Sequence, residues 1–278
     1  MNLGNLRINV LKDGTIKFDG GGMFGIVPKV LWERKIRCDR KNRVSMGLNC
    51  LLIRSNSKNI LVDTGVGRKE SEKTKENYGL SVGKLLRGLK DYGLTARDIN
   101  IVLLSHLHFD HCGGATKLDS KGRVVPTFPK ATYFAQKLSW EDATDPNTKG
   151  ASGYHPDDFM PIFERGRLEL LDGDAEIIPG VSVKLTNGHA SGHQITILGS
   201  GRQKVVYLGE LIPSHYHLHP QYISAFDQYP METLKLKREL IQQAEKEGWL
   251  VIFGHDPVEA AGYVESRNGQ VHFKPVTI

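Results

Sequence analysis

Residues 105–114 read SHLHFDHCGG, and they follow directly on the apolar run INIVLL of residues 99–104. This short stretch places three imidazoles and one carboxylate within six positions: His106, His108, Asp110 and His111. Imidazoles this close repel one another when protonated, and their burial without partners is unfavourable. Metal ligation accounts for the cluster, because neutral imidazole and carboxylate are common ligands of divalent transition metals. The stretch therefore predicts a metal centre at the end of a buried strand.

The spacing inside the cluster predicts two ions rather than one. In an extended backbone the side chains at i and i+2 point the same way, so His106 and His108 can reach one ion together. Asp110 and His111 fall past the turn and face towards a second ion. Gly113 and Gly114 let the backbone pass close to the site, and we expect them to lead into a helix.

The same pattern of an apolar run followed by an ionisable residue recurs along the chain. The runs are NILVDTG, INIVLLSHLHFDH, VSVKLTNGH, KVVYLGE and WLVIFGHD, which end on Asp63, the opening cluster, His189, Glu210 and His255. Such runs predict buried strands. Ligands of open α/β sheets gather beyond the carboxyl ends of the strands, so these ends predict one shared site.

Helical patterns lie between the predicted strands. Residues 81–94, SVGKLLRGLKDYGL, predict a helix capped by Ser81, and residues 230–248, PMETLKLKRELIQQAEKEG, predict one that stops near Gly248. Strands alternating with helices indicate an α/β fold. Between Trp140 and Ile178 the Gly-, Pro- and Asp-rich stretch ATDPNTKGASGYHPDDFMP (residues 143–161) predicts a long loop of the kind that often forms a lid or binds a ligand. Because no linker-like segment interrupts the chain, we expect a single domain over residues 1–278.

The composition of 278 residues, 39% hydrophobic and 24% charged, is that of a globular protein. The three cysteines are too few, and odd in number, for a disulfide framework, and they form no CxxC pair. We therefore expect reduced thiols and a cytoplasmic location. No signal-like N-terminus and no apolar run of about 20 residues is present, so we expect no membrane partner. The net charge is +6, but the densest basic stretch, residues 29–43, lacks the interleaved aromatic residues of a single-strand binder, which disfavours nucleic acid.

Five segments resemble the motifs of the metallo-β-lactamase superfamily, in the family's order. HLHFDH resembles its HxHxDH motif, NGHASGH (residues 187–193) is similar to GHxxGH, and LVDTG (residues 61–65) is similar to its first motif. LGE and FGHD stand where the family places a bridging carboxylate and a last histidine. The resemblance implies an αβ/βα four-layer sandwich that holds two metal ions.

Residue by residue, the resemblance implies a complete ligand set. The first ion would be bound by His106, His108 and His189, and the second by Asp110, His111 and His255, with Glu210 bridging. Asp63 and His193 would support the ligands by hydrogen bonds. The family usually has aspartate where this chain has Glu210, so one-sided binding by the longer side chain stays open. Nitrogen and oxygen ligands favour Zn²⁺, with Fe, Mn and Co as alternatives.

Two cations of this kind make a metal-bound hydroxide available at neutral pH, and Asp110 would carry a proton to the leaving group. We therefore expect a dinuclear hydrolase of small esters or lactones. MFGIVPKVLWE (residues 23–33) and FDQYPMETL (residues 226–234) are similar to the lactonase and organophosphate-hydrolase-like branch, which favours an N-acyl homoserine lactone over phosphotriesters and aryl esters. Two alternatives belong to other classes. An iron-dependent redox enzyme of the flavin-bearing kind would need an appended flavin domain, and none is evident. An RNA-processing nuclease would usually have an inserted domain or a long basic arm, and neither is evident.

The segment SHYHLH, residues 214–219, contains three alternating histidines. If it is extended, His215, His217 and His219 lie on one face, but no carboxylate or cysteine nearby completes a metal site. We interpret the segment as the wall of a substrate pocket, formed by His217, Tyr216 and Tyr222. Cys112 adjoins His111 outside the ligand pattern, so we expect it to pack in the core. A small-molecule substrate is the expected partner, and a homodimer stays open.

Overall fold

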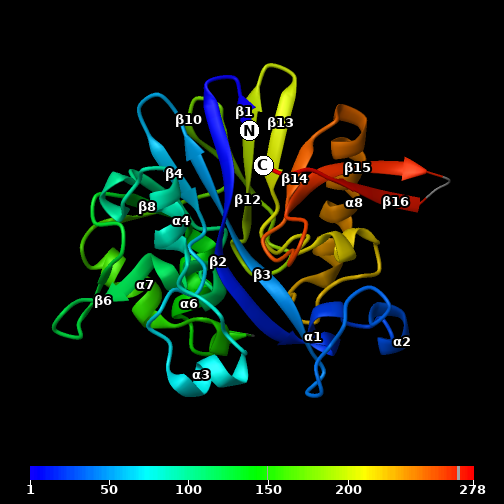
Figure 1. Cartoon of the computed structure of the whole chain (residues 1–278), viewed down its shortest axis with the longest axis horizontal. Helices are drawn as coiled ribbons and strands as arrows, with labels where there is room; N and C mark the ends of the chain where they lie inside the picture. Colours follow the sequence, from blue (N-terminus) through cyan, green and yellow to red (C-terminus); the bar gives the residue numbers. More distant parts are fainter. Residues whose placement is uncertain (149, 268–269) are drawn as a thin grey trace.

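The computed structural model describes residues 1–148, 150–267 and 270–278. Two seven-stranded sheets lie at the centre of the molecule (Figure 1). The first sheet has the order β1 (Asn2–Leu3), β2 (Leu6–Asp19), β3 (Arg43–Arg54), β4 (Asn59–Val62), β5 (Ile101–Leu103), β8 (Thr132–Gln136) and β9 (Leu168–Leu171). The second has the order β10 (Ala175–Ile178), β11 (Val181–Leu185), β12 (Gln194–Ser200), β13 (Gln203–Tyr207), β14 (Leu250–Ile252), β15 (Ala261–Arg267) and β16 (Gln270–Pro275).

The two sheets share one apolar core between their inner faces. Strand alternation sends Leu51 and Val62 of the first sheet into this core, where they meet side chains of the second sheet such as Val183 and Ile252. The intervening residues, such as Leu52, point to the outer face of the first sheet, which α4 (Leu85–Asp91), α6 (Lys137–Thr144) and α7 (Pro156–Phe163) cover. On the other side α8 (Pro230–Glu247) covers the second sheet. The expected αβ/βα four-layer sandwich is therefore confirmed.

The remaining elements are short. A hairpin of β6 (Thr116–Leu118) and β7 (Val124–Pro126) packs on α7. The small helices are α1 (Gly20–Phe24), α2 (Lys29–Trp32), α3 (Glu72–Asn77) and α5 (Phe109–Cys112), and the 3-10 turns are η1 (Ala96–Asp98), η2 (Gly113–Ala115), η3 (Ala151–Gly153) and η4 (His215–Leu218). None of the helices in the described ranges is long and apolar enough to cross a bilayer.

Parallel pairing brings the predicted strand ends to one edge of the sandwich. In the first sheet β4 and β5 are parallel, so Asp63 and the loop that begins at Leu104 leave at the same edge. In the second sheet β13 and β14 are parallel, so the loops that carry Glu210 and His255 also leave together. The strands expected from the five apolar runs are thus confirmed as β4, β5, β11, β13 and β14.

The predicted helix at residues 230–248 is confirmed, and it ends at Gly248 with a φ of +66°. The helix expected after Ser81 starts later, at Leu85. Ser81 instead forms an antiparallel bridge with Thr15, and the Asp13 carboxylate accepts a hydrogen bond from the Leu85 N–H at 3.2 Å. Tertiary contacts therefore hold the first four residues of the pattern outside the helix.

The long loop expected over residues 143–161 is confirmed only in its middle part, because α6 continues to Thr144 and α7 begins at Pro156. Pro156 does not break structure here but occupies the first turn of α7, where its missing N–H costs no hydrogen bond. The remaining loop, residues 145–155, contains the turn η3, and its Lys149 lies outside the described residues.

Candidate metal centre

The HxHxDH segment occupies the loop after β5 and the short helix α5. His108 precedes the helix in extended conformation, whereas Asp110 and His111 lie within it, and this change of backbone turns the two pairs to different sides. The helix thus begins before Gly113 and Gly114, and not after them as expected. Both glycines are nevertheless required, because a Cβ on Gly114 would lie 2.2 Å from the Thr64 carbonyl oxygen.

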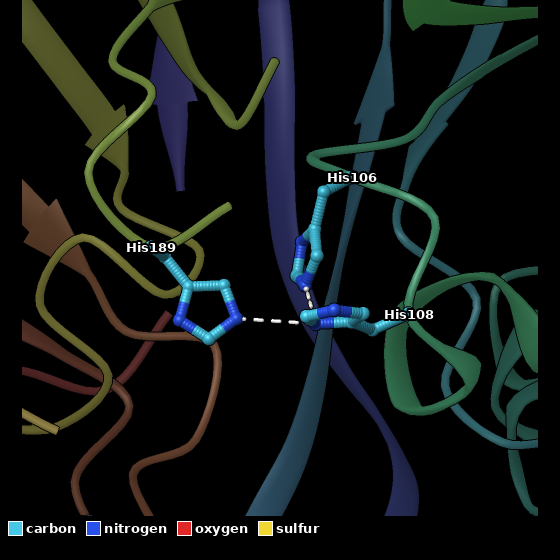
Figure 2. Close-up of side chains that lie close together, drawn as sticks. All are labelled: His106, His108 and His189. Atoms are coloured by element: carbon cyan, nitrogen blue, oxygen red, sulfur yellow. Dashed lines mark hydrogen bonds between the residues drawn. The ribbon is translucent and has the colours of Figure 1, made fainter. Parts of the chain in front are cut away.

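The first group of ligands consists of three histidines, with one ligand atom of each within 4.8 Å of the others. The His106 Nε2 lies 2.9 Å from the His108 Nδ1, and the His189 Nε2 lies 3.1 Å from that same atom. Figure 2 shows the three rings converging, two from the loop after β5 and one from the loop after β11. The predicted first group is therefore assembled from both sheets.

The second group consists of Asp110, His111, Glu210 and His255, all buried. The His111 Nε2 lies 3.0 Å from the His255 Nε2. The Glu210 Oε1 lies 2.6 Å from the His255 Nε2, and the Asp110 Oδ2 lies 3.3 Å from it. All seven residues predicted as ligands thus lie in one of two adjacent groups.

For three of the ligand histidines, the hydrogen-bond partner of Nδ1 determines which ring nitrogen carries the proton. The His255 Nδ1 faces the Gly47 carbonyl at 2.7 Å, the His111 Nδ1 faces the Asp63 carboxylate at 2.7 Å, and the His189 Nδ1 faces the Asp227 carboxylate at 3.0 Å. These oxygens only accept hydrogen bonds, so each Nδ1 donates and each neutral ring presents an Nε2 lone pair to its group.

Both groups fit a divalent cation. Ligand atoms held about 2.0 Å from a tetrahedral ion lie about 3.3 Å apart, close to the contacts of 2.9, 3.0, 3.1 and 3.3 Å found here. Facing lone pairs cannot hydrogen-bond to one another, and the second group adds two carboxylates. A positive charge at the centre of each group satisfies these atoms.

The pKa values reflect the same crowding. Burial and the neighbouring imidazoles lower the pKa of His106 well below its usual value, and they lower that of His108 to about 3. Burial also disfavours the cation of His255, but the Glu210 and Asp110 carboxylates outweigh it and raise its pKa to about 9. Positive charge is therefore favoured beside the carboxylates of the second group.

Asp63 connects the second group to the sheet. Its carboxylate accepts hydrogen bonds from the Ser105 N–H at 2.7 Å, from the Ser105 hydroxyl at 2.8 Å and from the Tyr207 hydroxyl at 2.9 Å, besides the bond from His111. The residue has a φ of +56°, a conformation unfavourable for a non-glycine residue, and these four bonds hold it there.

His193 lies behind the ligands rather than among them. Its Nε2 accepts a hydrogen bond from the Glu210 N–H at 3.0 Å, while its Nδ1 donates to the Thr186 hydroxyl at 2.6 Å. The preceding Gly209 has a φ of +52°, and a Cβ there would lie 2.7 Å from the His193 Nε2. His193 thus fixes the backbone that carries Glu210.

His108 is held differently from the other ligands. Its Nε2 is buried and has no hydrogen-bond partner among the residues that the structure describes. The ring instead packs on Tyr154, with a centroid distance of 4.5 Å, and a Cβ on Gly153 would lie 3.0 Å from it. Packing contacts alone therefore orient this imidazole.

A cavity of about 220 Å³ opens onto both groups. Four ligands line its floor: His108, Asp110, His189 and Glu210. Its walls come from Phe18, Tyr78, Phe109, Ala225, Phe226, Gly150, Ser152 and Gly153. Sequence reasoning missed these wall residues. Two of them carried a signal that could have found them: Phe109 lies inside the HxHxDH segment, and Phe226 begins the family-like segment of residues 226–234. The three residues from position 150 to 153 lie in the predicted long loop.

The residues expected to form the pocket lie elsewhere. The segment SHYHLH, residues 214–219, is not extended, because it contains the 3-10 turn η4. Its imidazoles therefore do not share a face. The His217 Nε2 donates to the Met23 carbonyl at 3.0 Å, and its ring stacks on Phe24 at 4.9 Å. Tyr216 and Tyr222 pack in the same apolar cluster, and none of the three lines the cavity. Cys112 is buried in the core as expected, where its thiol faces the Leu107 carbonyl.

Comparisons with known proteins agree with this geometry. The chain matches the family model described as "Metallo-beta-lactamase superfamily" over residues 46–255. An N-acyl homoserine lactonase from a Bacillus species is 25% identical over 233 residues, which cover 77% of this chain and 82% of the relative. A solved structure of a probable metal-dependent hydrolase from Staphylococcus aureus is 30% identical, with a TM-score of 0.90 over 99% of each chain. AidC, a dizinc quorum-quenching lactonase solved with N-hexanoyl-L-homoserine, shares the fold with a TM-score of 0.80 at 23% identity, over 100% of this chain and 97% of its own.

Proposed function

This chain belongs to the metallo-β-lactamase superfamily, and we propose that within it the protein is a two-metal hydrolase that opens small esters or lactones, with N-acyl homoserine lactones favoured. The observation that carries the proposal is that the two ligand groups share one cavity. His108 and His189 of the first group line it beside Asp110 and Glu210 of the second. A carbonyl bound there would be within reach of both groups.

Glu210 is proposed to bridge the groups. Its Oε1 lies 2.6 Å from His255 and 3.6 Å from His111, both in the second group. Burial disfavours the cation of His189 in the first group, but the charges of Glu210 and Asp227 outweigh burial and raise the pKa of His189. The Glu210 carboxylate lies among the ligands of the second group, and its charge also acts on His189 of the first group, which supports the proposed bridging role.

We propose Zn²⁺ for both positions, since the donors are nitrogen and oxygen atoms at tetrahedral spacing. Such ions lower the pKa of a coordinated water to about 7 and polarise a substrate carbonyl. Asp110 directs its Oδ2 towards His111 and His255, at 3.7 and 3.3 Å, which leaves Oδ1 to accept a proton from water and pass it to the leaving oxygen. Burial disfavours the Asp110 carboxylate, but protonated His111 and His255 outweigh burial and lower the pKa of Asp110 to about 2. Bound cations would supply positive charge at the same place while the imidazoles are neutral ligands, so the carboxylate would be ionised before it accepts this proton.

The cavity wall supports a neutral, apolar substrate. No lysine or arginine lines the cavity among the described residues, so outside the two ligand groups its described wall offers no charge to a charged substrate. The rings of Phe18, Phe109 and Phe226 offer apolar surface for an acyl or aryl arm and exclude water from the bond that is cleaved. Phosphotriesters and aryl esters are also neutral and apolar, and they are the second candidate class. The free thiols of Cys38, Cys50 and Cys112 support a reducing compartment such as the cytoplasm.

Hydrolysis assays on zinc-loaded protein test the proposal. We expect turnover of N-acyl homoserine lactones, measured as acid release in weakly buffered solution, to exceed that of phosphotriesters and aryl esters. The Asp172→Asn variant, which changes an exposed carboxylate, is the matched control for variants of the ligands. Zinc-loaded protein that leaves every lactone, ester and phosphotriester unchanged would overturn the proposal.

A further inference from the structure

The segment from α1 to the start of β3 carries an exposed apolar surface beside a dense set of cations. Ile26 is 89% exposed, Val30 60% and Leu31 46%. We call these three residues the apolar tip. Figure 1 places α1 and α2, which flank and carry the tip, at the periphery of the molecule, with α1 beside the end of β2. Aliphatic side chains exposed together in this way mark an interaction surface.

The same segment carries six exposed cations. They form what we call the cationic collar: Lys29, Arg34, Lys35, Arg37, Arg40 and Lys41. Within the described residues none of the six forms an ion pair, whereas Asp39 of the same segment is paired with Lys17 and Arg43. Glu33 is the only exposed acid among them. The collar therefore presents a net positive charge, although Asp19 lies close enough to Lys29 for the two charges to interact.

The core holds this segment rigidly, so its exposure is a property of the fold. Trp32 is 1% exposed and stacks on Phe24, which in turn stacks on His217. The side chains of Val30 and Leu31 point outward on the same short helix that buries Trp32. The packing of Trp32 therefore fixes the outward direction of these side chains, and their exposure does not result from a loose loop.

Among partners, an anionic lipid bilayer matches both parts of the surface. Headgroup phosphates attract lysine and arginine, and the boundary of the acyl chains accepts aliphatic side chains. A second copy of this chain would set one cationic collar against another, which is electrostatically unfavourable. Nucleic acid offers phosphates but no surface that would accept Ile26, Val30 and Leu31. The sequence predicted no membrane partner because it contains no spanning segment, but surface docking needs none. We propose that the apolar tip and the cationic collar dock this protein on anionic lipid bilayers.

The helix α1, which directly precedes the docking surface in the chain, contacts the wall of the cavity. The Ala225 N–H and the Ser224 hydroxyl both donate to the Gly22 carbonyl in α1, at 2.8 and 3.1 Å. Ala225 and Phe226 line the cavity, and a Cβ on Gly22 would touch the Phe226 ring. Docking therefore brings the cavity near the lipid, where acylated molecules concentrate. The docking itself does not depend on the proposed hydrolysis.

Vesicle sedimentation without substrate tests the docking separately from any activity. The probes are vesicles of phosphatidylcholine alone and vesicles of equal parts phosphatidylcholine and phosphatidylglycerol. We expect binding to the anionic vesicles only, weakening as salt is added because the collar charges become screened. Ile26→Ser with Leu31→Ser, and separately Arg34→Glu with Arg37→Glu, should each weaken binding by about tenfold or more.

Matched changes at exposed positions elsewhere are the controls: Val258→Ser for the tip, and Lys58→Glu with Lys130→Glu for the collar. All these sites are exposed, so the thermal transitions should equal that of the parent. Three outcomes would overturn the proposal: no binding to anionic vesicles; equal loss of binding in the control and test variants; or a dimer or a single-stranded RNA complex that the tip and collar variants abolish while vesicle binding is absent.

Discussion

The two ligand groups lie side by side, yet they are held by different forces. In the second group His111 and His255 each donate to an oxygen behind the ring, and two carboxylates face them in front. The first group contains no carboxylate, and His108 has a packing contact with Tyr154 where the others have a hydrogen-bond acceptor. Acceptors behind a ligand fix its orientation and raise its basicity, so the second group should bind its ion more tightly.

The largest effect should follow from the carboxylate that serves both binding and proton transfer. Asp110→Asn keeps the shape of the side chain but removes its charge and its ability to accept a proton. We expect kcat to fall by about 10²–10⁴, with the ion of the first group retained. Steady-state assays with metal analysis of the same samples measure both, and Asp172→Asn should behave as the parent. Undiminished turnover by the Asn variant would remove Asp110 from the chemistry.

A smaller effect should distinguish the two groups by affinity. Asp63→Asn tolerates the φ of +56° but no longer offers a carboxylate to His111. The affinity of the second group should fall by about 10–100-fold, whereas that of the first group should be unchanged. Competition with a chromogenic chelator measures the two affinities. Equal weakening of both groups would show that they are not separately supported.

The converse change should act on the first group. Tyr154→Leu removes the ring beneath His108, whereas Tyr154→Phe keeps the ring and removes only the hydroxyl that donates to Asp142. We expect the Leu variant to lower the affinity of the first group for its ion by less than about tenfold. The Phe variant should leave this affinity unchanged, and the same chelator assay measures both. If the Phe variant lowers the affinity of the first group as much as the Leu variant does, the hydroxyl and not the ring contact supports His108.

The smallest effect should come from a residue outside both groups. His155 stacks on Phe109, and its hydrogen bond with Glu70 raises the pKa of His155 above the usual 6.5. Burial opposes the charge of Glu70, but the bond and charge of His155 outweigh it and lower the pKa of Glu70 below the usual 4.5. The pair therefore contributes stability fully between pH 4.5 and 6.5. The contribution is lost as the pH rises through the raised pKa of His155, or falls through the lowered pKa of Glu70.

His155→Gln should accordingly lower the free energy of unfolding by under about 1 kcal/mol near pH 5.5, since the pair is partly exposed, and by less above neutral pH. Urea unfolding across this range measures the difference. Because neither ligand group contacts the substituted atoms, both metal affinities should stay as in the parent. A loss that grows with pH would contradict the assigned ion pair.

The ligands could be predicted from the sequence because their signals are local. Each follows an apolar run that makes a strand, and parallel pairing then gathers the strand ends at one edge. Most of the cavity wall had no such signal, since Phe18 and Tyr78 come from distant segments and belong to no motif. The role of His217 could not be predicted either, because its partner, the Met23 carbonyl, lies 194 residues away. Local propensity likewise failed at Ser81, where a bridge to Thr15 replaced the first turn of the helix.

Metal titration of the metal-free chain tests the central claim most directly, which is that two separately supported groups of ligands share one cavity. With zinc, elemental analysis combined with calorimetry should give two ions per chain, one for each group. The two should bind with distinct affinities, and Asp63→Asn should weaken the tighter step alone. A single ion per chain at saturation, or two ions that the substitution weakens equally, would contradict the account.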